Sequence, residues 1–109
     1  MTTPIERLKN KITKEVLWIY ILRLLKERPM YAYELKSKIR ENFKFEPATV
    51  SSYVVLYKLE KEGYVTAEWQ ESETGKPARK YYRLTPKGEE LLREGLAFLE
   101  ETVKKLKGE

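Results

Sequence analysis

The stretch LEKEGYVTAEWQESETGKPARKYYRLTPKG, residues 59–88, changes from a helical to an alternating hydrophobic pattern. A helix is expected to end before Gly63, because glycine commonly follows the last residue of a helix. Residues 64–69 and 80–84 then alternate as strands do, and residues 71–78 between them are rich in turn-forming types. Thr85 and Pro86 suit the cap and first position of another helix. The stretch therefore predicts a β-hairpin between two helices.

A long helical segment is predicted at the N-terminal end. It covers residues 4–27 and is broken near Thr13, which we expect to cap its second half. Residues 16–25 are apolar on more than one face, as in a helix buried between a domain core and a second body. Proline disfavours a helical conformation in the residue before it, so Arg28-Pro29 ends this segment.

Two further helices precede the hairpin. Residues 32–41 and 49–62 have helical spacing of apolar side chains, and residues 42–47 connect them. Two helices joined in this way are typical of a helix-turn-helix, whose second helix enters the major groove of DNA. The side chains expected to face the core are Ala32, Leu35 and Ile39 in the first of these helices, and Ser52, Val55, Leu56 and Leu59 in the second.

The last predicted helix, residues 86–107, has the most regular pattern in the chain. Its apolar side chains recur at intervals of four and three residues, which is the seam of a two-heptad coiled coil. In one interpretation this stripe packs on its own domain. We favour dimerisation, because the helix is longer than a small domain needs. The residues predicted at the dimer interface are Trp18, Ile21, Leu92, Leu96, Leu99, Val103 and Leu106.

These elements predict one domain over residues 1–109, with its core at residues 14–85. The expected fold class is mainly α with a small β-hairpin: a winged helix-turn-helix domain plus N- and C-terminal dimerisation helices. No apolar run is long enough to span a bilayer, and no secretion signal is evident, so we expect a cytoplasmic protein and no membrane partner. The chain is rich in Glu, Lys and Arg and has few Asn and Gln residues, a composition typical of proteins that work at high temperature.

The residue types that most catalytic sites need are missing. The chain contains no His, no Cys and no Asp, which excludes histidine-dependent triads, Cys–His pairs and His/Cys metal sites. Its five glycines are scattered and form no phosphate-binding loop. Paired glutamates are expected on solvated helix surfaces. We therefore predict that the chain is not an enzyme and has no metal or cofactor.

Charge points to nucleic acid as the partner. The net charge is +5, and residues 76–87 contain five lysines or arginines and no acid. Hydroxyl groups begin the helix at residues 49–62, and its outward positions carry tyrosines and valines that can contact phosphates or bases. We predict double-stranded DNA as the partner, with residues 49–62 as recognition helix and residues 65–84 as wing. The predicted DNA contacts are Tyr33, Thr49, Ser51, Tyr53, Val54, Tyr57, Lys58, Lys76, Arg79 and Lys80.

A protein-binding module remains as the alternative to a DNA-binding regulator at this stage. The outward aromatic face of residues 49–62 is also what a protein-binding surface shows, and the hairpin is then an ordinary solvated one. The chain in that case is a winged-helix module that binds protein without binding DNA. The basic stretch at residues 76–87 favours DNA. Since no Arg, Asn or Gln begins the recognition helix, we expect part of the readout to depend on DNA shape.

Several motifs resemble the PadR family of transcriptional regulators over about residues 14–92. They are Met30-Tyr31-Ala32-Tyr33-Glu34-Leu35, Tyr53 followed by Leu56, residues 59–65, and residues 71–88 with the specific run from Gly75 to Gly88. Two departures stand out. The family usually has Gly where Ala32 stands, and its Ser-Pro-Gly-Thr-Leu-Tyr lead appears here as residues 48–53, so that Tyr53 and the Ser51 hydroxyl carry over.

The resemblance implies a winged-helix homodimer that binds a palindromic operator and usually represses. In the family the N- and C-terminal helices build the dimer, which agrees with the apolar first helix and the heptad seam. Members with a short C-terminal region bind aromatic or drug-like effectors at the dimer interface. Trp18 and Phe98 are the candidates to line such a site here, and plain packing is the favoured alternative for both.

Overall fold

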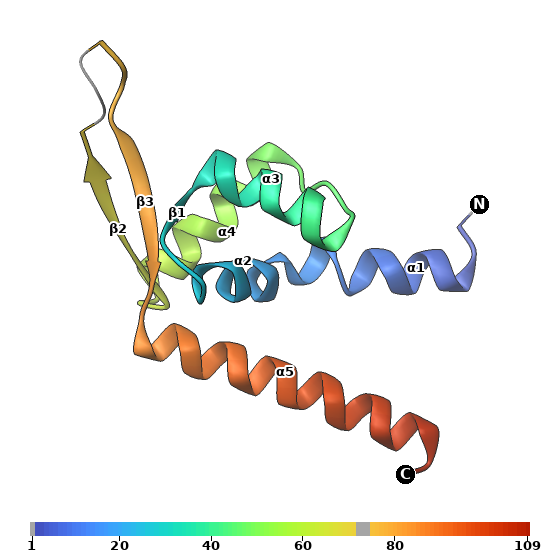
Figure 1. Ribbon diagram of the computed structural model, residues 1–109. Coiled ribbons are helices and arrows are strands. Elements are labelled where there is room, and N and C mark those ends of the chain that lie inside the picture. Colours follow the sequence, from blue (N-terminus) through green and yellow to red (C-terminus); the bar gives the residue numbers. More distant parts are fainter. Residues whose placement is uncertain (1, 72–74) are drawn as a thin grey trace.

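The computed structural model describes residues 2–71 and 75–109 (Figure 1). Met1 and residues 72–74 lie outside the described residues. Residues 72–74 belong to the stretch in which the turn of the hairpin was predicted. The predicted fold class is confirmed, because the structure is mainly helical with a small antiparallel sheet. The elements are α1 (Pro4–Lys11), the 3₁₀ turn η1 (Lys14–Val16), α2 (Leu17–Leu25), β1 (Met30–Tyr31), α3 (Ala32–Phe43), α4 (Thr49–Lys61), β2 (Val65–Gln70), β3 (Arg79–Leu84) and α5 (Pro86–Lys107).

The N-terminal segment breaks where the sequence predicts, but through a different interaction. Thr3 and Glu6 form a capping box at the start of α1, which satisfies backbone amides that have no partner within the helix. Thr13 stands at the N-cap position of η1, but its side chain makes no capping hydrogen bond there. Its hydroxyl instead donates backward to the carbonyl of Lys9 over 2.6 Å, so it closes α1. The predicted position of Thr13 at the start of the second half is confirmed, but the predicted capping hydrogen bond of its side chain is not formed.

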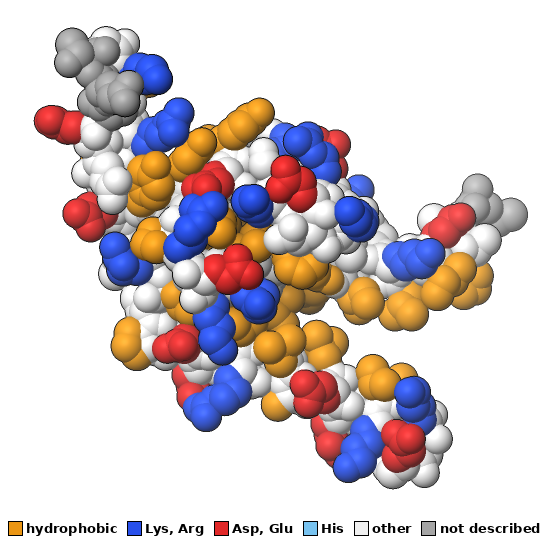
Figure 2. Space-filling model, in the orientation of Figure 1, with side chains coloured by type: hydrophobic (Ala, Val, Ile, Leu, Met, Phe, Trp, Pro, Cys, Tyr) orange, Lys and Arg blue, Asp and Glu red, His pale blue; other side chains and the backbone are white. Residues whose placement is uncertain are grey.

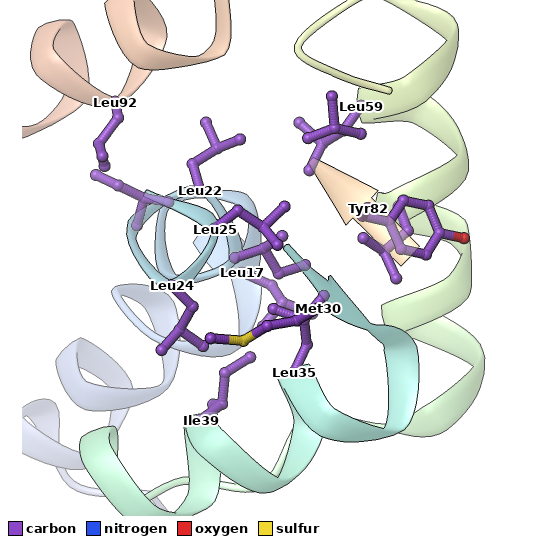
Figure 3. Packing of buried hydrophobic residues seen from close by; sticks show 14 residues of the cluster. Leu17, Leu22, Leu24, Leu25, Met30, Leu35, Ile39, Leu59, Tyr82 and Leu92 are labelled. Atoms are coloured by element: carbon purple, nitrogen blue, oxygen red, sulfur yellow. The ribbon is translucent and has the colours of Figure 1, made fainter. Parts of the chain in front are cut away.

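The core is built around α2 (Figure 3). Six of the nine residues of α2 are buried, so this helix is apolar nearly all round, as its sequence indicates. It contacts α3, α4, β3 and α5, and side chains from each of these elements complete the core. Complete burial of one Leu or Ile side chain contributes about 1.5–3 kcal/mol. Packing around α2 is thus the main source of stability for the domain.

The sheet contains a strand that the sequence pattern does not reveal. Its order is β1-β3-β2, and all neighbours are antiparallel. In the hairpin, Val65 is paired with Leu84 and Gln70 with Arg79. The missed strand, β1, has only two residues, and Met30 pairs with Tyr82. Two residues are too few for a period to show, so β1 is identified only by its pairing with β3.

The start of α5 is fitted tightly against the end of α4. The Thr85 hydroxyl accepts a hydrogen bond from the Gly88 amide and donates toward the carbonyl oxygens of Gly63 and Tyr64. Gly88 lies so close to the Tyr64 carbonyl that a Cβ at this position would overlap that oxygen. This junction sets the direction in which α5 leaves the domain. From there, α5 runs along α2 and its distal half extends away from the core (Figure 1).

Candidate nucleic-acid interface

The predicted recognition helix, α4, has one buried and one exposed face. Ser52, Leu56 and Leu59 are buried. The Ser52 hydroxyl donates to the Ala48 carbonyl over 3.0 Å, so this polar side chain has a partner where it is buried. The exposed face carries an apolar and aromatic set that the core does not use. It consists of Val50, Tyr53, Val54 and Tyr57, which are 76%, 55%, 47% and 63% exposed.

The first turn of α4 includes a contact that the sequence pattern does not show. Thr49 and Ser51 are both exposed, as their predicted role requires. Lys36 of α3 donates to the Thr49 hydroxyl over 2.8 Å, which places a cation at the start of α4. The two residues are thirteen positions apart, so their proximity depends on how α3 and α4 pack. Tyr33, also predicted as a DNA contact, is 71% exposed on the first turn of α3.

The hairpin projects beyond the helices, and its cations lie in different surroundings (Figure 1). Lys76 and Arg79 are exposed. The Arg79 guanidinium lies 4.5 Å from the centroid of the Tyr31 ring, a distance at which a cation is attracted to an aromatic face. Lys80 is different, because its ammonium forms an ion pair with Glu60 of α4 at 3.1 Å. The structure therefore leaves Arg79 on the surface but draws Lys80 toward the recognition helix.

Trp69 on β2 belongs to this region but was not among the predicted residues. It is paired with Lys80 across the hairpin and is 68% exposed. Val65, Ala67 and Trp69 alternate along β2 and share one face, which is the core face at Val65. Trp69 is exposed because the hairpin extends past the helices that cover Val65. The sequence pattern cannot show this exposure, because it depends on how far the hairpin extends beyond the helices.

The surface expected to form a dimer lies on α1 and α5. On α5, Leu96, Leu99, Val103 and Leu106 are 42%, 40%, 51% and 82% exposed. On α1, which was not assigned contact residues, three apolar side chains are also about half exposed. Figure 2 shows apolar side chains along the edge of α1 that faces α5. The α1 residues are Ile5, Leu8 and Ile12, at 55%, 53% and 45%. We call these seven side chains the exposed stripes.

Two residues predicted at the dimer interface need correction. Ile21 and Leu92 are only 1% and 2% exposed and belong to the core of the single subunit. They cannot face a partner, because side chains of their own subunit cover them. The prediction missed this because the helical period identifies apolar positions but does not show what covers them. Trp18 is half-buried and lies against α5 of its own subunit, near Gly95. Only the exposed part of the Trp18 ring is therefore available for the predicted dimer interface.

Comparison with known proteins connects these features to a family. The model of the transcriptional regulator PadR-like family matches residues 21–94. The chain belongs to the PadR-like family. An uncharacterized protein of Lysinibacillus sphaericus is 39% identical over 77 residues, which are 68% of this chain and 69% of that protein.

Solved structures of PadR-like proteins share the fold. A PadR-like transcription factor from Bacteroides fragilis is 32% identical with a TM-score of 0.78, covering 94% of this chain and 97% of its own. Bacillus subtilis PadR, solved in complex with operator DNA, is 30% identical with a TM-score of 0.68. That match covers 74% of this chain and 47% of the Bacillus chain. The family model describes transcriptional regulators, and the Bacteroides neighbour is a transcription factor.

The match to the family model does not include the exposed stripes. It spans the segment from within α2 to the first part of α5, and it stops at residue 94. All three stripe residues of α1 and all four of α5 lie outside that range. The matched part therefore corresponds to the winged domain, and the two flanking helical segments carry the apolar surface.

One groove of this PadR-like chain bears on the predicted effector site. It has a volume of about 330 Å³ and is lined by Trp18, Val55, Lys58, Leu59, Glu62, Tyr64 and Leu91. Phe98 is not among these residues and is 71% exposed. Of the two candidate residues, only Trp18 lines this groove. Lys58, predicted as a DNA contact, lies on the flank of α4 that borders this groove.

In the part of the chain that the structure describes, no three acidic side chains gather closely enough to hold a metal ion. No helix of residues 2–71 and 75–109 is long and apolar enough to cross a membrane.

Proposed function

We propose that this PadR-like chain is a homodimeric, sequence-specific repressor that binds a palindromic operator. Helix α4 enters the major groove and the β2–β3 hairpin lies on the phosphate backbone. The observation that carries the proposal is the exposed face of α4, where Tyr53 and Tyr57 are exposed beside a hairpin with surface cations. A winged helix uses these two elements to bind DNA. The operator complex of Bacillus subtilis PadR supports the same use of the fold here.

The proposed homodimer follows from the exposed stripes. Seven large apolar side chains on α1 and α5 are at least 40% exposed and form two stripes, and exposed apolar stripes of this kind are typical of an interaction surface. A twofold dimer presents two copies of α4 at a fixed spacing, so it reads two half-sites of opposite direction. This geometry is the reason to expect a palindromic operator. A regulator of chromosomal genes works in the cytoplasm.

Fluorescence anisotropy provides the direct test. The purified protein is titrated against labelled DNA from its own promoter and against a scrambled duplex, at two salt concentrations. We expect tighter binding to the promoter duplex, and a steep loss of affinity as salt rises, because phosphate contacts release counterions. Absence of binding to either duplex at low salt would instead support the alternative of a protein-binding module.

Arg79→Ala tests the wing. We expect weaker binding to promoter and scrambled DNA by a similar factor, and a decrease of about one in the slope of log affinity against log salt. The side chain is exposed on β3, and its guanidinium lies over the Tyr31 ring. Arg93→Ala is the matched control, since it removes the same charge from α5, on the side of α2 opposite to α4 (Figure 1). An unchanged slope in Arg79→Ala would remove this residue from the DNA contacts.

Tyr53→Ala tests base readout by α4. We expect the preference for promoter over scrambled DNA to fall about tenfold, the effect of losing one good base contact. Tyr53→Phe keeps the ring and separates its contribution from that of the hydroxyl group. Competition titrations with both duplexes measure the ratio. If both affinities fall equally, Tyr53 contacts the backbone and does not read bases.

A further inference from the structure

The wing is tied directly to the recognition helix by side chains. Lys80 of β3 donates from Nζ to Oε1 of Glu60 in α4 over 3.1 Å, although the two residues are 20 positions apart. Both side chains are about one-third exposed, at 34% and 37%. An ion pair that is partly shielded from water and has hydrogen-bond geometry is stronger than one on an open surface. It therefore restrains the angle between the hairpin and α4.

The ring of Tyr82 adds a second partner for Lys80. The two residues lie on the same face of β3, and the Lys80 ammonium is 5.5 Å from the ring centroid. Burial raises the pKa of the Tyr82 phenol, and the charge of Lys80 acts in the opposite direction. The hydrogen bond to Glu60 raises the pKa of Lys80, which keeps the ammonium charged. Lys80 is thus held by α4 on one side and by its own strand on the other.

This arrangement argues against the predicted phosphate contact of Lys80. To reach DNA, the ammonium has to leave both Glu60 and the Tyr82 ring. Glu60 then remains as an unpaired carboxylate beside a polyanion, which is costly for a partly buried charge. Arg79 is less constrained, because successive residues of a strand point to opposite faces and its guanidinium lies over the Tyr31 ring without an ion pair among the described residues. Its exposed guanidinium is the cation better placed for a phosphate.

We propose that Lys80 and Glu60 are positioning residues, whose ion pair sets the orientation of the wing relative to α4. With the pair intact, the hairpin and the recognition helix present their contacts to one DNA duplex at the same time. Without it, the hairpin samples more orientations, and binding has to restrict it again. The inference rests on the proposed DNA-binding function. It gives Lys80, which was predicted as a DNA contact from its charge, a positioning role instead.

The test is a double-mutant cycle on the full-length protein. Lys80→Met, Glu60→Gln and the double variant are titrated with promoter DNA over a range of salt concentrations, with Arg79→Ala as the comparison. We expect each single variant to bind about three- to tenfold more weakly. The double variant is expected to bind no more weakly than the poorer single variant. The salt slope stays unchanged in all three variants but falls by about one in Arg79→Ala.

Glu60→Gln discriminates most sharply between the two roles. If Lys80 binds a phosphate, removing the Glu60 charge releases the ammonium and reduces repulsion, so affinity rises or stays the same. That result, or a lower salt slope in Lys80→Met, would overturn the proposal. Equal melting temperatures of the variants and the wild type show that weaker binding does not come from unfolding.

A further measurement separates failure of the inference from failure of the proposed function. Amide hydrogen exchange of residues 79–84 reports wing opening without DNA, and we expect faster exchange in both single variants. If the wild type binds no duplex while the variants exchange faster, the proposed function fails and the ion pair still positions the wing. Unchanged exchange in both variants would overturn the positioning role whether or not the protein binds DNA.

Discussion

Replacing Leu99 with glutamate is expected to convert the protein into a monomer whose operator affinity is lower by about a hundredfold or more, because two half-sites are no longer bound together. Leu99 is 40% exposed in the middle of the α5 stripe. A carboxylate there has to be buried without a partner when two subunits meet, and this cost exceeds what one apolar contact contributes. The monomer keeps its fold, because Leu99 is not part of the subunit core.

Sedimentation equilibrium gives the mass of the variant, and anisotropy with promoter DNA gives its affinity. Lys105→Gln is the matched control, since it also changes the net charge by one negative unit on α5. Lys105 is outside the stripe and pairs with Glu101 on the helix surface. We expect the control to remain dimeric. A dimer of Leu99→Glu as stable as the wild type would show that the α5 stripe is not the interface.

Gly88→Ala is expected to lower the free energy of unfolding by about 2 kcal/mol, although alanine favours a helix more than glycine does. The added Cβ overlaps the carbonyl oxygen of Tyr64 and lies 2.7 Å from Cδ1 of Leu84. A backbone carbonyl cannot move away alone, because the same oxygen accepts hydrogen bonds from Thr85. The start of α5 therefore has to shift, and the junction that directs this helix is strained.

Gly95→Ala on the same helix is the control for this substitution. A Cβ there lies 2.9 Å from Cδ1 of Ile19 and 3.0 Å from the edge of the Trp18 ring, both of which are ends of side chains that can adjust. The gain in helix propensity offsets this crowding, so we expect a change of less than about 1 kcal/mol. Chemical denaturation at one protein concentration measures both variants, since the stability of a dimer depends on concentration. Equal effects at the two glycines would contradict the tight fit at Gly88.

Local patterns were enough to predict most elements of this fold. The helices that became α3 and α4 were predicted to within two residues of their observed ends, because their period depends only on neighbours in sequence. The hairpin followed from alternation and turn residues in the same way. Strand β1 was missed, since two residues show no period and become a strand only by pairing with β3.

The candidate site was predictable in composition but not in arrangement. The exposed face of α4 and the basic wing were recognised from spacing and charge. Three details depended on packing between distant segments: the contact of Lys36 with Thr49, the exposure of Trp69, and the ion pair of Lys80 with Glu60. Charge identified Lys80 as a cation near the wing, but its orientation is decided by which carboxylate the fold places beside it.

The order of elements, the fold class and the family can all be predicted from the amino-acid sequence, because hydrophobic period, turn chemistry and motif spacing are properties of contiguous residues. Which apolar side chains stay exposed for a partner depends on how the helices pack in three dimensions. Leu92 follows the same period as Leu96 and Leu99 on α5, yet Leu92 is buried in the subunit whereas Leu96 and Leu99 are exposed. The hydrophobic period shows only that one face of α5 is apolar. Because α5 diverges from α2 along its length, that face is covered near Leu92 and exposed farther along the helix.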